Sequence, residues 1–154
     1  MANAAHILDA ARAQGHAENL AYAGAVTPEQ AYALLQAESN CKLIDVRTNA
    51  ERDWVGRVNL PLRQQGAIEW NTYPANKQNP EFLTQLAQTA KKDTILLFLC
   101  RSGARSQCAA ALATQNGYLN CFDILDGFEG GKDSDGHRKT SAGWCYVGLP
   151  WLGA

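Results

Sequence analysis

The sequence predicts an α/β fold, in which a single domain is built on a central, mostly parallel five-stranded sheet with helices on both faces. Segments typical of strands and of helices alternate along the 154 residues, as they do in parallel sheets with helical crossovers. The run 94–99 is the most apolar strand segment, so it should lie in the middle of the sheet. The chain is 46% hydrophobic and has no internal repeat or low-complexity linker, so it can bury one core and no second domain is expected.

The N-terminal segment is predicted to be a helix outside the fold proper. Residues 4–20 are rich in alanine, with apolar residues roughly at helical spacing and Gly15 as an interruption. We therefore divide the chain into an N-terminal helical extension, residues 1–22, and an α/β domain, residues 23–154.

The elements of the α/β domain follow from local signals. Thr27, Pro28 and Gln30 form the N-cap, first position and capping box of a helix that runs to about Glu38. Further helices are predicted over 49–54, 79–90 and 107–115. Strands are predicted over 23–26, 42–46, 57–60, 94–99 and 120–125, of which 57–60 is weak and is stopped by Pro61.

Composition excludes several classes of function. The net charge of −1 offers no footprint for nucleic acid or for an anionic membrane. No apolar run approaches the roughly 18–20 residues of a membrane span, and the N-terminus lacks the pattern of a secretory signal. Five cysteines, an odd number, argue against a complete disulfide framework, so we expect a cytoplasmic protein in a reducing compartment.

No metal or cofactor is expected. No two cysteines have C-x-x-C spacing, and the three histidines form no H-E-x-x-H pattern. Neither a G-x-G-x-x-G sequence nor a P-loop is present.

Cys100 is the strongest candidate for a reactive residue. It follows the apolar run 94–99 and precedes a short turn that leads into the helix predicted over 107–115. Backbone N–H groups and the helix dipole converge at such a position, and Arg101 and Arg105 add positive potential, so the nucleophilic thiolate should be favoured at neutral pH. In the following helix, Cys108 is expected to pack in the core.

Polar residues end three of the predicted strands. These ends are Asp45–Arg47, Cys100–Arg101 and Asp126–Gly127. Since the carboxyl ends of parallel strands meet at one edge, where ligand sites form, we expect these groups to surround one mouth.

Three motifs resemble the rhodanese (sulfurtransferase) domain. They are the sequences L-I-D-V-R at 43–47, C-R-S-G-A-R-S at 100–106 and L-D-G-F-E-G-G at 125–131. Gly143-Trp144 and Gly148-Leu149-Pro150 resemble the closing segment of that domain, so the resemblance covers roughly residues 25–151. It implies a cysteine that takes a sulfane sulfur from a donor, carries it as a persulfide and passes it to a thiophilic acceptor. The family's usual G-H-I-P-G-A stretch is absent, and the insert near 133–139 is longer and more polar than usual, so the substrate stays open.

The turn after Cys100 is predicted to hold the anionic sulfur. The residues from Cys100 through Arg101, Ser102, Gly103 and Ala104 to Arg105 can curl so that their N–H groups point inward, as in an anion nest. The two arginines suit an anionic donor such as thiosulfate, because guanidinium groups bind oxyanions through forked N–H donors. Ser106 is expected to cap the helix rather than to contact sulfur.

Asp45 and Arg47 are expected to support this loop without reacting. Asp45 could bind a loop arginine or a loop N–H group, or it could form an ion pair at the strand end; the sequence favours neither.

Three functions remain open from the sequence. The first is a sulfurtransferase with a small-molecule sulfur donor and a thiol or cyanide as acceptor. The second is a cysteine-dependent phosphatase or arsenate reductase, although their loops have C-x5-R spacing, whereas Cys100 and Arg105 are spaced as C-x4-R. The third is a non-catalytic docking module. A weak homo-oligomer or a protein acceptor also stays open.

Overall fold

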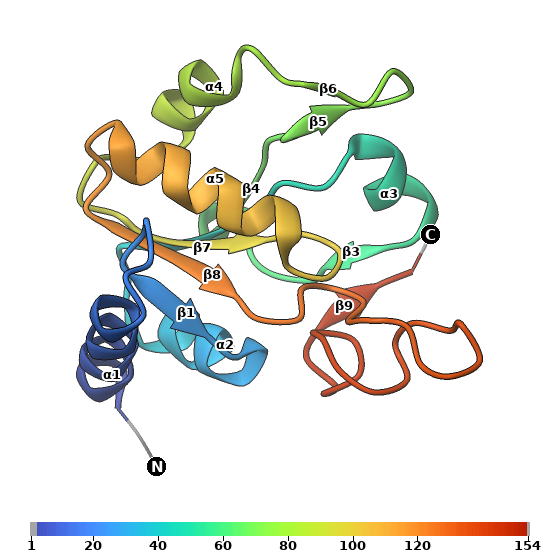
Figure 1. Ribbon diagram of the computed structural model, residues 1–154, viewed down its shortest axis with the longest axis horizontal. Coiled ribbons are helices and arrows are strands. Elements are labelled where there is room, and N and C mark those ends of the chain that lie inside the picture. The colour runs from blue at the N-terminus through green and yellow to red at the C-terminus, as the bar shows by residue number, and fades with distance from the viewer. Residues whose placement is uncertain (1–2, 154) are drawn as a thin grey trace.

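The computed structural model describes residues 3–153, and its centre is a parallel sheet of five strands (Figure 1). The strands lie in the order β1-β8-β7-β2-β4, and each neighbouring pair is parallel. Their bounds are β1 Gly24–Val26, β2 Cys41–Asp45, β4 Gln65–Ala67, β7 Ile95–Leu99 and β8 Asn120–Ile124. The predicted α/β class and the central place of the most apolar strand, β7, are therefore confirmed.

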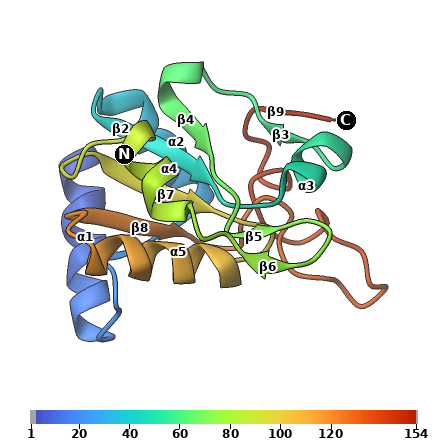
Figure 2. The same cartoon turned by 90° about the horizontal axis from the view of Figure 1, so that it is seen from above.

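Helices cover both faces of the sheet (Figures 1 and 2). On one face lie α1 (Ala4–Ala17) and α2 (Pro28–Ala37); on the other lie α4 (Phe82–Thr89) and α5 (Ala104–Gln115). Each face has its own apolar cluster, because alternate residues of a strand point to opposite faces. In β7, Leu97 and Leu99 join the first cluster, while Leu96 and Phe98 join the second.

Two helices begin with a capping box. At α2, the Thr27 hydroxyl accepts the Gln30 N–H, and the Gln30 side chain accepts the Thr27 N–H, as the sequence predicted. The short helix α3 (Asn49–Trp54) has the same arrangement, between Thr48 and Glu51. These bonds satisfy N–H groups that a helix start would otherwise leave unpaired.

One predicted strand lies outside the main sheet. Residues 57–60 were expected to pair there, but only β3 (Arg57–Val58) forms, and it pairs antiparallel with β9 (Trp151–Leu152). The edge of the main sheet is instead β4, which follows the short 3-10 helix Leu62–Gln64. The strands β5 (Asn71–Thr72) and β6 (Lys77–Gln78) form a separate antiparallel pair.

The helix α1 packs tightly on the sheet rather than forming an appendage. Its Ile7 and Ala11 are buried in the first core cluster. Gly15 lies within the helix, where a Cβ would overlap the Ala23 carbonyl, and a Cβ at Gly24 would overlap the Ala11 carbonyl. The glycine expected to interrupt the helix thus permits close approach to β1. The division of the chain at residue 22 stays a prediction.

The helix α5 begins earlier and presents a different face than expected. It starts at Ala104, and its buried residues are Ser106, Ala109, Ala110 and Ala113. Cys108 is exposed, so the prediction that it packs in the core is wrong. An alanine-rich helix has little hydrophobic contrast between its faces, and here a serine that forms buried hydrogen bonds points inward.

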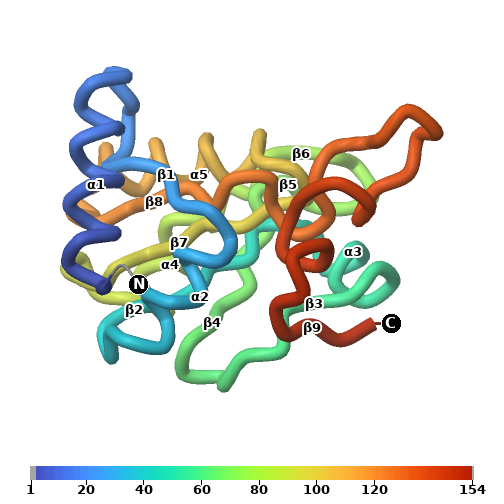
Figure 3. Tube along the Cα trace, turned by 90° about the horizontal axis from the view of Figure 1, so that it is seen from below, coloured from blue at the N-terminus to red at the C-terminus, as the bar shows by residue number. Residues whose placement is uncertain are grey.

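The carboxyl edge of the sheet collects the segments that surround Cys100. Residues 126–150 follow β8 and run beside α3 and β3 at this edge (Figures 1 and 3). The Phe128 N–H bonds the Cys100 carbonyl at 2.8 Å, and the Glu129 N–H bonds the Arg101 carbonyl at 2.9 Å. Between residues 3 and 153, no helix has both the length and the apolar character needed to cross a membrane.

Candidate active site

Cys100 lies where β7 ends and α5 begins. Gly103 is the N-cap of α5, and its φ of 128° is a conformation that favours glycine. This conformation accompanies a hydrogen bond from the Gly103 N–H to Sγ of Cys100, 3.0 Å long. The sulfur therefore lies at the positive end of the α5 dipole, with one amide donating to it. Cys100 is only 1% exposed, so the sulfur lies beneath the loop surface.

On its buried side, the sulfur of Cys100 contacts the hydroxyl of Ser106, which in turn contacts the carboxyl group of Asp123. The Ser106 Oγ lies 3.3 Å from Sγ of Cys100 and 2.5 Å from Oδ1 of Asp123 on β8. It also lies 3.0 Å from the Gly103 carbonyl oxygen. Ser106 does not cap α5, contrary to the prediction, since Gly103 holds that position.

Asp123 was missed at the level of the sequence. Burial raises the pKa of Asp123 to about 7, although its hydrogen bond with Ser106 acts to lower it. Nearby Asp126 adds to the rise. The available signal was a carboxylate in the middle of the otherwise apolar run 121–124.

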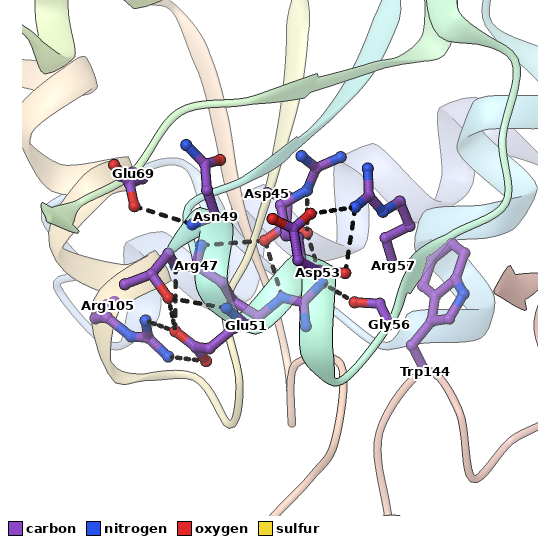
Figure 4. A network of polar contacts seen from close by, with 12 residues as sticks. Asp45, Arg47, Asn49, Glu51, Asp53, Gly56, Arg57, Glu69, Arg105 and Trp144 are labelled. Atoms are coloured by element: carbon purple, nitrogen blue, oxygen red, sulfur yellow. Dashed lines mark hydrogen bonds and ion pairs between the residues drawn. The ribbon is translucent and has the colours of Figure 1, made fainter. Parts of the chain in front are cut away.

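Arg105 is already paired with a carboxylate (Figure 4). Its Nη1 and Nη2 donate to Oε1 and Oε2 of Glu51 at 2.6 and 2.9 Å. Burial acts to raise the pKa of Glu51, but Arg105, together with bonds from Thr48, lowers it to about 2. The hydrogen bonds to Glu51 in turn raise the pKa of Arg105, although burial acts to lower it. Glu51 was also missed, although Thr48-x-x-Glu51 carries the capping-box pattern.

Asp45 and Arg47 form a buried ion pair behind this site (Figure 4). The Nε and Nη2 of Arg47 donate to the two carboxylate oxygens of Asp45 at 3.0 and 2.8 Å. Nη2 also donates to the Gly56 carbonyl, and the guanidinium lies 4.2 Å from the centre of the Phe128 ring. Among residues 3–153, the charged partners of Asp45 are Arg47 and Arg52, not a loop arginine. The arrangement is therefore the strand-end pair that the sequence left as one of two alternatives.

The remaining loop residues form the surface above the sulfur. Arg101, Ser102 and Ala104 are exposed, whereas Gly103 is buried. Gly127 packs directly against the backbone of the loop. Its φ is 64°, and a Cβ there would lie only 2.5 Å from the Cys100 carbonyl oxygen, so a larger residue would not fit. The structure thus gathers Cys100, Gly103 and Ser106, and the sulfur-binding role of the other loop residues stays a prediction.

A cleft of about 630 Å³ borders the loop. It lies between α3, the turn joining β5 to β6, and the two loop arginines. Its lining residues are Thr48, Ala50, Glu51, Trp54, Val55, Thr72, Tyr73, Pro74, Asn76, Arg101 and Arg105. Two exposed aromatic side chains, Trp54 (82% exposed) and Tyr73 (69% exposed), line it. Cys100 does not line the cleft, so a ligand there would touch the loop before the sulfur.

In the part of the chain that the structure describes, no three His, Cys, Asp or Glu side chains are grouped so that they could hold a metal ion. All five cysteines are free.

Comparisons with known proteins agree with this geometry. Residues 23–154 match the family described as the STR4 middle domain. A crystal structure of Rv0390 from M. tuberculosis is 41% identical, with a TM-score of 0.78, over 85% of this chain and 98% of that one. An uncharacterized protein of Rickettsia conorii is 35% identical over 79% of this chain and 91% of its own length. The thiosulfate sulfurtransferase GlpE of Actinobacillus succinogenes is 31% identical over 81% of this chain and 86% of its own.

The solution structure of a polysulfide-sulfur transferase from Wolinella succinogenes, 23% identical with a TM-score of 0.58, shares the fold. A parallel five-stranded sheet, a cysteine at the end of its central strand and relatives that include a thiosulfate sulfurtransferase lead to one conclusion. This chain belongs to the rhodanese-like family, within the group described as the STR4 middle domain.

Proposed function

We propose that this chain is a sulfurtransferase that moves a sulfane sulfur from thiosulfate or a persulfide to cyanide or a thiol. The Cys100 thiolate attacks the outer sulfur of the donor and forms a new S–S bond. The old S–S bond breaks, and its electron pair leaves with the donor residue, which is sulfite when thiosulfate is the donor. The acceptor then attacks the outer sulfur of the persulfide and releases the Cys100 thiolate, so that no outside oxidant or reductant is consumed.

One observation carries the proposal: Sγ of Cys100 lies at the N-terminus of α5, where the Gly103 N–H donates to it at 3.0 Å. Such a position stabilises a thiolate first and a persulfide anion afterwards, because both carry negative charge at the same place. An external base is not needed when the thiolate is the resting form.

Phosphate-ester hydrolysis is the weaker alternative. A cysteine-dependent phosphatase needs a free loop arginine for the phosphate oxygens, but both terminal nitrogens of Arg105 are held by Glu51. A non-catalytic docking role would not require the cysteine, the N-terminal amide and the arginines together.

The reaction suits a reducing compartment such as the cytoplasm, where the free cysteines would stay reduced. We propose small molecules as donor and acceptor, with entry through the cleft bordered by Arg101 and Arg105. A protein acceptor or a weak homo-oligomer is compatible with the exposed aromatic walls of that cleft.

Mass spectrometry of the intact protein and its peptides tests the proposal. After treatment with thiosulfate, the Cys100 peptide should gain the mass of one sulfur atom, and cyanide should remove it. Cys100→Ser should abolish both steps. Cys108→Ser is the matched control, because Cys108 is an exposed thiol on α5, the helix that follows Cys100, and would report non-specific reaction. A persulfide that forms on Cys108 but not on Cys100, or a Cys100 thiol inert to alkylation in the folded protein, would refute the assignment.

A further inference from the structure

The chain of contacts inward from Cys100 has no part in the reaction as described so far. Its three members are Sγ of Cys100, the hydroxyl of Ser106 and the carboxyl of Asp123. They come from three elements that are adjacent in space: the end of β7, the first turn of α5 and the middle of β8. Ser106 is 0% exposed, and Asp123 is 1% exposed, so water cannot readily substitute for any link.

Ser106 has a single proton and three neighbouring acceptors. The acceptors are Oδ1 of Asp123 at 2.5 Å, the Gly103 carbonyl at 3.0 Å and Sγ of Cys100 at 3.3 Å. An ionised Asp123 can only accept, so it draws the Ser106 proton to itself and away from sulfur. A protonated Asp123 donates to the Ser106 Oγ instead and leaves the hydroxyl proton free to point at the sulfur.

We infer that Asp123 is a positioning residue that controls, through Ser106, the negative charge on the Cys100 sulfur. In the form that supports the reaction, the Asp123 O–H donates to Ser106, and the Ser106 O–H donates to the Cys100 thiolate. In the opposite form, the thiol proton stays on sulfur and Asp123 is ionised. The two forms differ by the shift of one proton along each of the two links, from sulfur to Oγ and from Oγ to Oδ1, so the net charge is unchanged. This inference rests on the proposed role of Cys100 as the nucleophile.

The surroundings of Asp123 favour its protonated form. Its Oδ2 is buried and has no hydrogen-bond partner among the described residues. The strands on either side present apolar neighbours, Ala25 and Phe98, at the same register. The polar groups that face it are Ser106 and Gln107 on α5, Asp126 after β8 and Tyr22 before β1, and none of them is a cation. Burial raises its pKa to about 7, so both forms are accessible near neutral pH.

Alkylation of Cys100 by neutral iodoacetamide, followed from pH 5 to 9 by peptide mass spectrometry, tests the inference. A Cys108→Ser background removes the exposed thiol on α5. The expected profile of rate against pH has an inflection near pH 7, where ionisation of Asp123 turns the Ser106 proton away from the sulfur. Asp123→Asn keeps a donor to Ser106 but removes the charge, so its profile should lack the inflection near pH 7. Below about pH 6, where Asp123 of the parent is itself protonated, variant and parent should react alike; above about pH 7, where Asp123 is ionised, the variant should react up to roughly tenfold faster.

Asp126→Asn is the matched control. It removes a carboxylate that follows β8 and does not reach Ser106, so its profile should keep the inflection near pH 7, moved slightly down because Asp126 adds to the rise in the pKa of Asp123. Ser106→Ala should make the Asp123→Asn substitution nearly silent, because the link between the two is gone. An Asp123→Asn profile that coincides with that of the parent would overturn the inference.

Carboxyl carbon NMR of the protein without these substitutions covers the case in which Asp123→Asn does not fold. Asp123 should titrate near pH 7, and a midpoint close to that of an ordinary aspartate would also overturn the inference. The outcome is separable from that of the proposed function. If a persulfide forms but the Asp123→Asn profile equals that of the parent, only the inference about Asp123 is refuted. If the expected profile is seen but no persulfide forms, only the proposed sulfur-transfer reaction is refuted.

Discussion

Glu51→Gln should make Cys100 more reactive toward anionic reagents. In the structure the Glu51 carboxylate occupies both terminal nitrogens of Arg105, the position that an anionic donor would take. The glutamine keeps the shape and can still complete the capping box with Thr48. The substitution therefore frees the guanidinium and removes a negative charge while leaving the start of α3 intact.

The magnitude follows from Coulomb's law. An anion bound to Arg105 would lie roughly 5–6 Å from the Glu51 carboxylate. Glu51 is 22% exposed, so an effective dielectric of about 40, between a protein surface and bulk water, is appropriate. The repulsion removed is then about 1.5 kcal/mol, or roughly a tenfold change in rate at low salt.

The assay compares alkylation of Cys100 by iodoacetate, an anion, with alkylation by neutral iodoacetamide, in a Cys108→Ser background. The ratio of the two rates should rise about tenfold in Glu51→Gln and fall back as salt is added. Asp53→Asn is the control, since it removes an exposed carboxylate from the same helix that pairs with Arg57 and not with the loop. The reasoning fails if the ratio stays constant or drops, because Glu51 would then serve only to hold Arg105 in its active position.

Two further predictions concern stability. Asp45→Asn should lower the free energy of unfolding by about 3–5 kcal/mol, because it leaves the fully buried Arg47 charge without a partner; urea unfolding would measure it, and a loss below about 1 kcal/mol would show that the pair is not needed. Asp123→Asn should gain stability over the parent as pH rises. The pKa of Asp123 is raised to about 7 in the folded state, so its stabilising effect is complete below the pKa of the unfolded chain, near 4, and is lost as pH rises through 7. The difference in unfolding free energy between variant and parent should grow by up to about 4 kcal/mol from pH 4 to pH 8, and a constant difference would contradict the raised pKa.

Local signals made much of the fold predictable from the sequence. The apolar run before Cys100 identified the central strand, and the Thr27 capping box fixed the start of α2. The edge strand β4 was harder to predict from the sequence. It is only three residues long, and its pairing depends on where the sheet ends rather than on its own residue pattern. The face of α5 was mispredicted because its alanines are nearly equivalent and the decision rests on Ser106, whose partner Asp123 is 17 residues away.

Of the candidate site, only Cys100 and the turn that follows it were predictable from the sequence. Cys100 and its glycine-containing turn follow from a strand end, a turn and a helix start, all within about ten residues of sequence. Glu51, the partner of Arg105, is 54 residues away in the sequence, so no local pattern could pair the two. The capping-box pattern that begins at Thr48 indicates only that Glu51 belongs to the first turn of a helix. The sequence alone suggested two free loop cations, whereas the structure leaves only Arg101 uncompensated among the loop residues that border the cleft.

This pairing changes the account of how the proposed Cys100 thiolate would be stabilised. If both arginines were free, long-range positive charge would do most of the stabilising, and salt would weaken it. With Arg105 neutralised by Glu51, the main stabilising contacts are the Gly103 N–H and, when Asp123 is protonated, the Ser106 hydroxyl. These contacts are buried and short, so they are screened little and act on a small atom rather than on a large oxyanion. A site of this kind holds a single sulfur well, and its preference among donors then depends on the cleft outside the loop, where Trp54, Tyr73 and Arg101 meet the incoming molecule.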